Sequence, residues 1–288
     1  MSRARAAAAL LLLLAGAPAG AEELIRVLVK VAPRTVEELR LEDYVAGVVA
    51  GEMPASFPPE ALKAQAVAAR SYALTRKLEA QAANRRWDIA TGVLAQVYAA
   101  GQASPAARAA VAATEGEVLV LGMEPVEAYF HAACGGRTEG GLAALGRDLS
   151  YLSPVECGRC DDAPGVRWKV KVAASEVGKV TGLGGAATDA RIVSRSPSGR
   201  AERLELARGR TKVVVAATDL RQRLGFSRLP SLAFEVRLEG GALVFEGRGR
   251  GHGAGLCQWG AAGLAREGKT YREILLHYYP GTDVVRMY

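Results

Sequence analysis

Glu52 is the residue of this sequence best placed for acid–base chemistry. It follows an apolar stretch predicted as a short helix over 41–50, and it lies in a turn with Met53 and Pro54. A carboxyl group in such a place can be partly withdrawn from water, which raises its pKa toward that of a working general acid. The alternative, an exposed glutamate at a helix end, is the more common case on physical grounds alone.

Basic residues follow on a second, longer helix, predicted from Pro58-Pro59 to about Leu78. Lys63 and Arg70 are seven residues apart, so they share one face of this helix. Such a pair can hold an anionic or polyhydroxylated ligand. The alternative is a basic face that is simply solvated.

Histidine and cysteine residues form a second group, with the spacing of metal ligands. His131 and Cys134 are followed, after a glycine-rich stretch, by Cys157 and Cys160. Four such side chains suit a tetrahedral zinc site, which would also order the intervening segment. Because four protein ligands close the site, it would be structural and not catalytic. The alternative is a disulfide from Cys134 to Cys157 or Cys160, which leaves His131 and one cysteine unexplained.

A glycine-rich loop over 247–255 carries the third group. Its alternate glycines allow backbone to approach a ligand or another segment closely. A helix predicted over 256–267 begins at its end, so backbone N–H groups there can bind polar ligand groups. The loop lacks the Gly-Lys-Ser/Thr ending of a phosphate loop. His252 lies within it, and the alternative role for this histidine is to satisfy local backbone groups.

Three ordered segments contain these residues: YVAGVVAGEMPASFPPEALKAQAVAARSYAL, AYFHAACGGRTEG, and GRGRGHGAGLCQWGA followed by HYYPGT. Together they resemble the SpoIID/LytB family of bacterial cell-wall proteins, from about residue 24 to the C-terminus. The resemblance implies lytic transglycosylase activity on peptidoglycan glycan strands, typically strands lacking stem peptides. It also implies that Glu52 is the essential glutamate of such an enzyme.

The implied reaction needs a single carboxyl group. Glu52 would protonate the departing glycosidic oxygen and then deprotonate the C6 hydroxyl of N-acetylmuramic acid, which attacks its own anomeric carbon. The attacking hydroxyl belongs to the substrate, so no second carboxylate is required, unlike in ordinary glycosidases. The product carries an anhydro-muramyl end.

The resemblance further implies a groove lined by residues of the first and third segments, with His252 and Gln258 facing the long helix. The candidates on that helix are Lys63, Gln65, Arg70 and Tyr72. Some family members also look able to hold zinc near the second motif, which His131, Cys134, Cys157 and Cys160 fit. Cys257 stands where the family usually has serine, and we expect a small buried residue or an unpaired thiol there.

Two other classes of function compete with this interpretation. A non-catalytic, wall-binding enhancer of an N-acetylmuramoyl-L-alanine amidase would carry an idle Glu52 and leave no anhydro ends. A zinc-dependent hydrolase would need an open metal position, which one histidine and three cysteines do not leave.

The elements that must position these residues predict an α+β fold. We expect helices around Glu52 and at the C-terminus, packed on a mostly antiparallel β core. The stretch over about 166–246 offers several short β-like runs and is predicted as a β-rich insertion or subdomain. Residues 22–288 would then form one SpoIID/LytB-like domain with this insertion.

The N-terminus predicts export. Residues 1–21 combine Arg3 and Arg5, an apolar run and an A-x-A cleavage site, as in a signal peptide. Cleavage lowers the net charge from +7 to about +5, which suits an anionic partner such as the cell wall. We expect the periplasm, cell wall or extracellular space, no membrane span after cleavage, and no nucleic acid partner, since basic residues are not interleaved with aromatics. An uncleaved anchor is the alternative.

Overall fold

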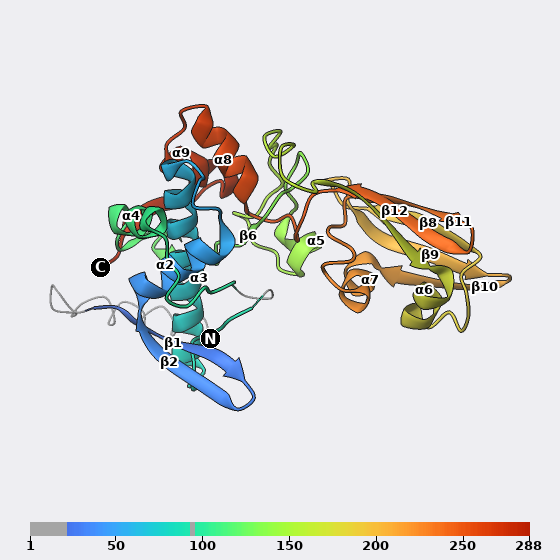
Figure 1. The fold of residues 1–288 in the computed structure, drawn as a ribbon, viewed down its shortest axis with the longest axis horizontal. Coiled ribbons are helices and arrows are strands. Elements are labelled where there is room, and N and C mark those ends of the chain that lie inside the picture. The colour runs from blue at the N-terminus through green and yellow to red at the C-terminus, as the bar shows by residue number, and fades with distance from the viewer. Residues whose placement is uncertain (1–21, 93–95) are drawn as a thin grey trace, which may run out of the picture.

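The computed structural model describes residues 22–92 and 96–288, so the predicted signal peptide lies outside the described residues. Two lobes are joined by a narrower waist (Figure 1). The outer unit, residues 167–248, has a hydrophobic core of its own. The main unit, formed by the described residues before and after it in the chain, has a larger core.

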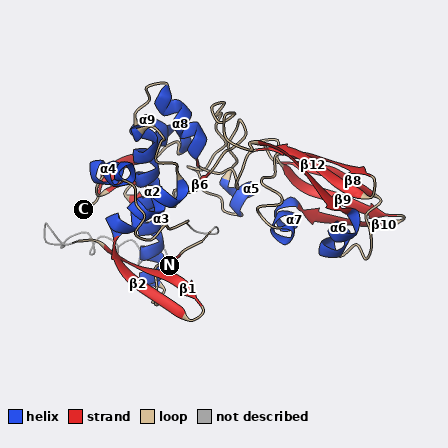
Figure 2. Cartoon of the chain, viewed as in Figure 1, coloured by secondary structure: helices blue, strands red, loops and turns tan. Residues whose placement is uncertain are grey.

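Most of the helices lie in the main unit, and two helices of eight residues each lie in the outer unit (Figure 2). Their bounds are α2 Leu41–Glu52, α3 Pro59–Ala82, α4 Pro105–Ala113, α5 Gly141–Leu145, α6 Ala174–Thr181, α7 Ala217–Leu224, α8 Gln258–Arg266 and α9 Tyr271–Tyr278.

The long helix α3 is the centre of the main unit. It begins with proline at its first position, where no backbone N–H is needed. Many of its buried residues are alanines, so neighbouring helices approach its axis closely, and α2, α4, α8 and α9 all contact it. This packing brings the end of α2 beside the start of α8, although the two are about two hundred residues apart in sequence.

The strands form small sheets. Their bounds are β1 Leu24–Val31, β2 Arg34–Arg40, β3 Ile89–Ala90, β4 Glu117–Leu121, β5 Glu124–Pro125, β6 Phe130–His131, β7 Arg167–Ala173, β8 Asp189–Arg195, β9 Ala201–Arg208, β10 Thr211–Ala216, β11 Phe234–Glu239, β12 Ala242–Arg248, β13 Leu256–Cys257 and β14 Asp283–Arg286. In the main unit the strand orders are β2-β1-β3, β14-β4-β5 and β13-β6.

The outer unit contains two antiparallel sheets, β11-β12-β7 and β10-β9-β8. Helices α6 and α7 pack against them, with Val177 and Leu220 in the shared core. The described residues combine helices with several small sheets whose pairing is mostly antiparallel, so the predicted α+β fold is confirmed.

Buried polar contacts fix the outer unit to the main unit. The Arg200 guanidinium, which is 3% exposed, donates to the carbonyl oxygens of Cys134 and Arg137 at 2.7 and 3.0 Å. The Ser198 hydroxyl donates to Glu139 Oε2 at 2.7 Å. Breaking these contacts would leave a buried charge without partners, so they hold the two units in one arrangement.

No helix in residues 22–92 or 96–288 is both long and apolar enough to cross a lipid bilayer.

Candidate functional site

Glu52 is the last residue of α2, and the helix therefore extends beyond the predicted 41–50. Its side chain is partly buried. One oxygen, Oε1, accepts a hydrogen bond from the Val97 backbone N–H at 2.8 Å. The Glu52 carboxyl group is thus held by a segment that is distant in sequence.

Glycine on α2 is what lets that segment pass. A Cβ atom at Gly51 would lie 2.8 Å from the Val97 carbonyl oxygen, closer than real Cβ contacts occur. One turn earlier, a Cβ atom at Gly47 would meet the Tyr98 ring at 2.4 Å. The two glycines are four residues apart and so lie on one face of α2, where the backbone around Val97 crosses. This close crossing delivers the N–H group to Glu52.

The other oxygen of Glu52 is held from α8. Gln258 Nε2 donates to Glu52 Oε2 at 3.1 Å, and it also lies 3.4 Å from Gln65 Oε1. Gln65 and Gln258 are 0% and 3% exposed. The three side chains form a row from α3 through α8 to α2, which fixes the orientation of the carboxyl group.

The electrostatic setting of Glu52 favours its protonated form. Burial raises the pKa of Glu52, while the hydrogen bonds from Val97 and Gln258 oppose this by stabilising the carboxylate. The net direction is upward. A carboxyl group with a raised pKa keeps its proton closer to neutral pH, as a general acid requires.

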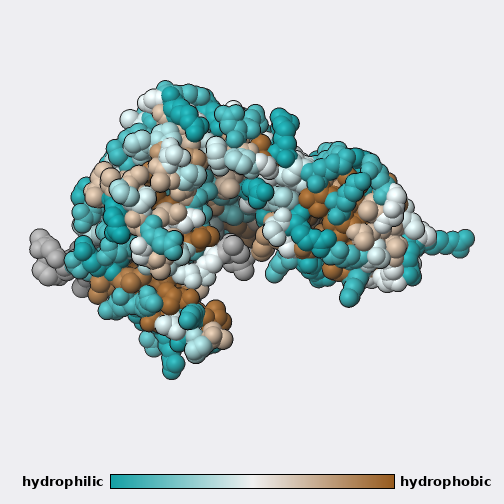
Figure 3. Space-filling view, in the orientation of Figure 1, coloured by the Kyte–Doolittle hydropathy of each residue, from teal (hydrophilic) through white to brown (hydrophobic). Residues whose placement is uncertain are grey.

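A cavity of about 620 Å³ lies beside Glu52, between the main and outer units. The surface is indented between the two lobes (Figure 3). The lining residues come from both units: Glu52, Tyr72, Val97, Tyr129, Phe130, His131, Ala144, Leu145, Thr218, Arg221, Gln222, Phe226, Leu232, Gly251 and His252. Among these described lining residues, Glu52 is the one acid and Arg221 the one permanent cation.

Two histidines lie side by side in the cavity wall, with ring centroids 5.5 Å apart. His252 Nδ1 accepts from the Ala254 N–H at 3.1 Å, so Nε2 carries the proton and donates to the Phe130 carbonyl at 2.9 Å. His131 Nδ1 lies 3.1 Å from the Ala254 carbonyl oxygen and must therefore donate to it.

This pairing leaves one nitrogen without a partner. His131 Nε2 is an acceptor, and it is buried with no hydrogen-bond partner among the described residues. Burial lowers the pKa of His131 well below its ordinary value, and it lowers that of His252 to about 4. Both rings are therefore neutral near pH 7. His252 matches the alternative role, a histidine that satisfies local backbone groups.

The groove residues expected on α3 do not all lie at the cavity in the structure. Tyr72 lines the cavity. Lys63 does not, and its Nζ donates to Glu60 at 2.7 Å. Arg70 is 0% exposed, with its guanidinium 2.6 and 2.8 Å from the Glu42 carboxylate. Arg70 therefore lies in the core and cannot contact a ligand here, which corrects the expectation from helical periodicity.

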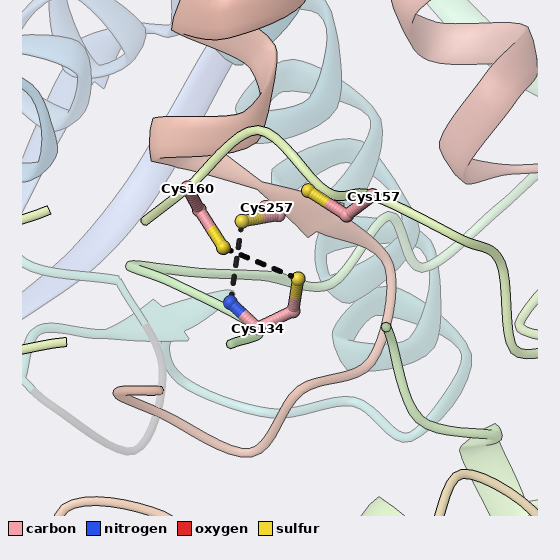
Figure 4. A group of neighbouring side chains, drawn as sticks. All are labelled: Cys134, Cys157, Cys160 and Cys257. Carbon is pink, nitrogen blue, oxygen red and sulfur yellow. Dashed lines mark hydrogen bonds between the residues drawn. The ribbon is translucent and has the colours of Figure 1, made fainter. Parts of the chain in front are cut away.

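Four buried cysteines converge at the start of α8: Cys134, Cys157, Cys160 and Cys257 (Figure 4). Their sulfur atoms lie within 4.8 Å of one another, and Cys134 Sγ and Cys160 Sγ are 3.6 Å apart. Tetrahedral zinc with Zn–S bonds of about 2.3 Å requires sulfur atoms spaced somewhat under 4 Å. This cysteine cluster can therefore hold a metal ion.

The cluster corrects the ligand set expected from spacing. Its fourth member is Cys257, and His131 instead faces the cavity. From the sequence we expect a small buried residue or an unpaired thiol at Cys257, and the total of four cysteines is the signal that could have identified it as the fourth ligand. The parallel pairing of β13 with β6, Leu256 beside Phe130 and Cys257 beside His131, brings the two distant segments together. No spacing rule predicts that pairing.

Two further residues of the site carried no usable sequence signal. Val97 contributes only its backbone N–H, which any residue except proline could supply. Arg221 comes from α7 in the outer unit, a part of the sequence outside the three segments that resemble the SpoIID/LytB family.

Comparisons with known proteins agree with this arrangement in two units. The profile described as SpoIID, stage II sporulation protein, matches residues 31–121. A domain of unknown function, DUF8618, matches residues 165–255. The first match contains Glu52 and α3, and the second contains the whole outer unit.

Curated relatives extend over most of the chain. Stage II sporulation protein D of Bacillus subtilis is 33% identical over 271 residues, covering 88% of this chain and 77% of that protein. An uncharacterized protein of Brachyspira hyodysenteriae is 34% identical over 255 residues, covering 87% and 68%. The amidase enhancer of Bacillus subtilis is 25% identical over 287 residues, covering 83% of this chain and 40% of its own length.

Proposed function

Since this chain belongs to the SpoIID family of stage II sporulation proteins, we propose that it is a peptidoglycan lytic transglycosylase with Glu52 as its acid–base group. The setting of Glu52 carries the proposal. The carboxyl group is partly desolvated, fixed by two donors, and placed on a cavity large enough for sugar rings.

The reaction uses this one group twice. Protonated Glu52 donates its proton to the glycosidic oxygen as the bond from that oxygen to the anomeric carbon of N-acetylmuramic acid breaks. The Glu52 carboxylate then accepts the proton of the C6 hydroxyl of the same sugar, whose oxygen bonds to the anomeric carbon. An anhydro-muramyl end forms, the proton is back on Glu52, and no water is consumed.

The number of carboxyl groups at the cavity supports this scheme over a hydrolytic mechanism that uses two carboxyl groups. Ordinary glycosidases place two carboxyl groups about 5–10 Å apart across the scissile bond. Glu52 is the sole acid among the described residues that line the cavity. A nucleophile carried by the substrate removes the need for the second group.

Product analysis tests the proposal. Peptidoglycan stripped of stem peptides, and intact peptidoglycan, are digested with wild type and with Glu52→Gln, and the fragments are identified by mass spectrometry. We expect anhydro-muramyl ends from the wild type and at least a hundredfold fewer from the variant, the order expected for losing a general acid. A folded wild type that produces none from either substrate would overturn the proposal.

A second candidate is supported by the similarity to an amidase enhancer. In that role the chain would bind the wall and stimulate a separate N-acetylmuramoyl-L-alanine amidase. This second role would be favoured if wild type and Glu52→Gln stimulate an added amidase equally and neither protein produces anhydro-muramyl ends.

The place of action and the metal content complete the proposal. The signal-like residues 1–21 support export to the periplasm or cell wall. The donor set of the cysteine cluster supports one structural zinc ion, since four thiolates close the coordination shell and leave no open position. Zinc supplies no chemistry to the reaction in this scheme. It would fix Cys257, the residue that directly precedes Gln258.

A further inference from the structure

Arg221 places an uncompensated positive charge on the wall of the cavity. It extends from α7, and burial lowers its pKa to about 10, so it remains charged at neutral pH. Burial is the sole cause of that shift, and no acid among the described residues forms a salt bridge with Arg221. A half-buried charge without a counter-ion is costly to the folded protein. Such a charge favours the binding of an anionic ligand.

The guanidinium is held in a fixed orientation. Its Nε and Nη2 donate to the carbonyl oxygens of Leu229 and Pro230, both at 2.8 Å. Its Cζ lies 4.8 Å from the centre of the Phe226 ring. Nη1 makes no hydrogen bond within the described part of the chain, which leaves one N–H edge for a ligand in the cavity. A prearranged donor loses little entropy when a carboxylate arrives.

His131 supplies a second, complementary group. The His131 ring lines the same cavity, and its buried Nε2 is an acceptor with no partner among the described residues. An acceptor of this kind needs a hydroxyl or amide N–H from the ligand. Together the cavity offers a cation for a carboxylate, an acceptor for a hydroxyl or amide, and aromatic rings such as Tyr72 and Tyr129 for the face of a sugar.

We propose that Arg221 and His131 form a subsite for an acidic sugar, with the free carboxylate on Arg221 Nη1 and a hydroxyl or amide N–H on His131 Nε2. Within the proposed transglycosylase reaction, on which this inference rests, that sugar is muramic acid with an unsubstituted lactyl carboxylate. A stem peptide converts this carboxylate into a neutral amide, so Arg221 is a specificity-determining residue. The outer unit thereby selects the substrate, while the main unit supplies Glu52.

Binding of a soluble probe tests the subsite without relying on cleavage. The protein is the full chain carrying Glu52→Gln. The probes are a peptide-free glycan oligosaccharide and the same compound with its lactyl carboxyl groups converted to methylamides. We expect the free carboxylate form to bind about 10- to 100-fold more tightly, as for a charge-assisted hydrogen bond in a buried site. Arg221→Gln should abolish this preference.

The matched control is Arg223→Gln, on the same helix. Arg223 donates to the Val180 carbonyl and does not line the cavity, so the preference should persist. A folded Arg221→Gln protein that keeps the full preference overturns the subsite. The protein with Arg221 intact provides a test that does not depend on whether the Arg221 variant folds. If that protein binds the two probes equally, or binds neither, the subsite is overturned as well.

The outcomes for subsite and reaction are separate. Anhydro-muramyl products from wild type without a carboxylate preference would leave the reaction standing and reject the subsite. A carboxylate preference that depends on Arg221, in a protein that forms no anhydro-muramyl products, would support the subsite and reject the reaction.

Discussion

The Glu52 carboxyl group is balanced between burial, which favours its protonated form, and two hydrogen-bond donors, which favour the carboxylate. The first step of the proposed reaction needs the proton. The rate should therefore fall as pH rises through the raised pKa of Glu52. The two donors keep that pKa from rising further, and they fix where the proton is delivered.

Replacing Gln258 by alanine should separate these two effects. Loss of its hydrogen bond removes stabilisation of the carboxylate, so the pKa of Glu52 rises and the basic limb of the rate profile moves to higher pH. Looser positioning should lower kcat about tenfold, which corresponds to about 1.4 kcal/mol. The measurement is the pH dependence of kcat/KM.

The exposed Gln102 offers a control of the same residue type, and Gln102→Ala should change neither quantity. A basic limb that stays in place, or moves to lower pH, in the Gln258 variant would contradict this assignment.

Arg70 should behave as a core residue. Its charge is buried and paired with Glu42, and it also donates to the Glu117 carbonyl at 3.0 Å. Arg70→Met leaves Glu42 without its partner and should lower the free energy of unfolding by about 3–5 kcal/mol. Urea denaturation measures this. A folded variant of unchanged stability but raised KM would instead restore the ligand-binding role that helical periodicity indicated.

At the scale of elements, α2 and the backbone around Val97 work as a pair. Gly51→Ala would by itself strengthen a helix by up to about 1 kcal/mol. Here the added Cβ would lie 2.8 Å from the Val97 carbonyl and push that segment off α2. We expect a lower melting temperature and at least a tenfold loss of activity, since the Val97 N–H leaves Glu52. Unchanged activity with raised stability would show that the crossing is not needed.

Local patterns predict most of the elements but not their contacts. The short β-like runs and turn signals anticipated β7 to β12, and the apolar stretch at Leu41 anticipated α2. The exposed strand β2 was missed because it carries mostly charged residues and lacks apolar alternation. The short strand β6 pairs with β13, which lies far along the chain, so no local pattern reveals that contact.

The site follows the same rule: local patterns predict some of its residues but not the contacts that tertiary packing creates. Glu52 and Gln258 stood out by residue type within long motifs, and the structure brings them together. Arg70 looked like a groove residue because periodicity gives the face of a helix, not what covers that face. Val97 and Arg221 belong to segments placed by tertiary packing, which no local pattern encodes.

At the scale of the whole molecule, the cysteine cluster ties the loop before β7 to the start of α8. We expect one zinc ion per purified chain, and a chelator should remove it with a marked fall in melting temperature, because metal binding contributes to folding. Cys257→Ser should lower both zinc content and stability. Elemental analysis and thermal unfolding provide the two readouts.

His131 is the discriminating control, since spacing alone made it a ligand. His131→Ala should retain zinc, because its ring faces the cavity and not the cluster. Disulfide-bonded cysteines in non-reducing peptide mapping, or a melting temperature that does not respond to a chelator, would contradict the metal site.

The most direct test of the central claim, that one carboxyl group suffices because the substrate supplies its own nucleophile, is digestion of peptide-stripped peptidoglycan in water enriched in the heavy oxygen isotope. We predict anhydro-muramyl ends from wild type with no heavy oxygen incorporated, and almost none from Glu52→Gln. Reducing muramyl ends that carry the heavy isotope would show that water attacks, and would contradict the mechanism proposed for Glu52.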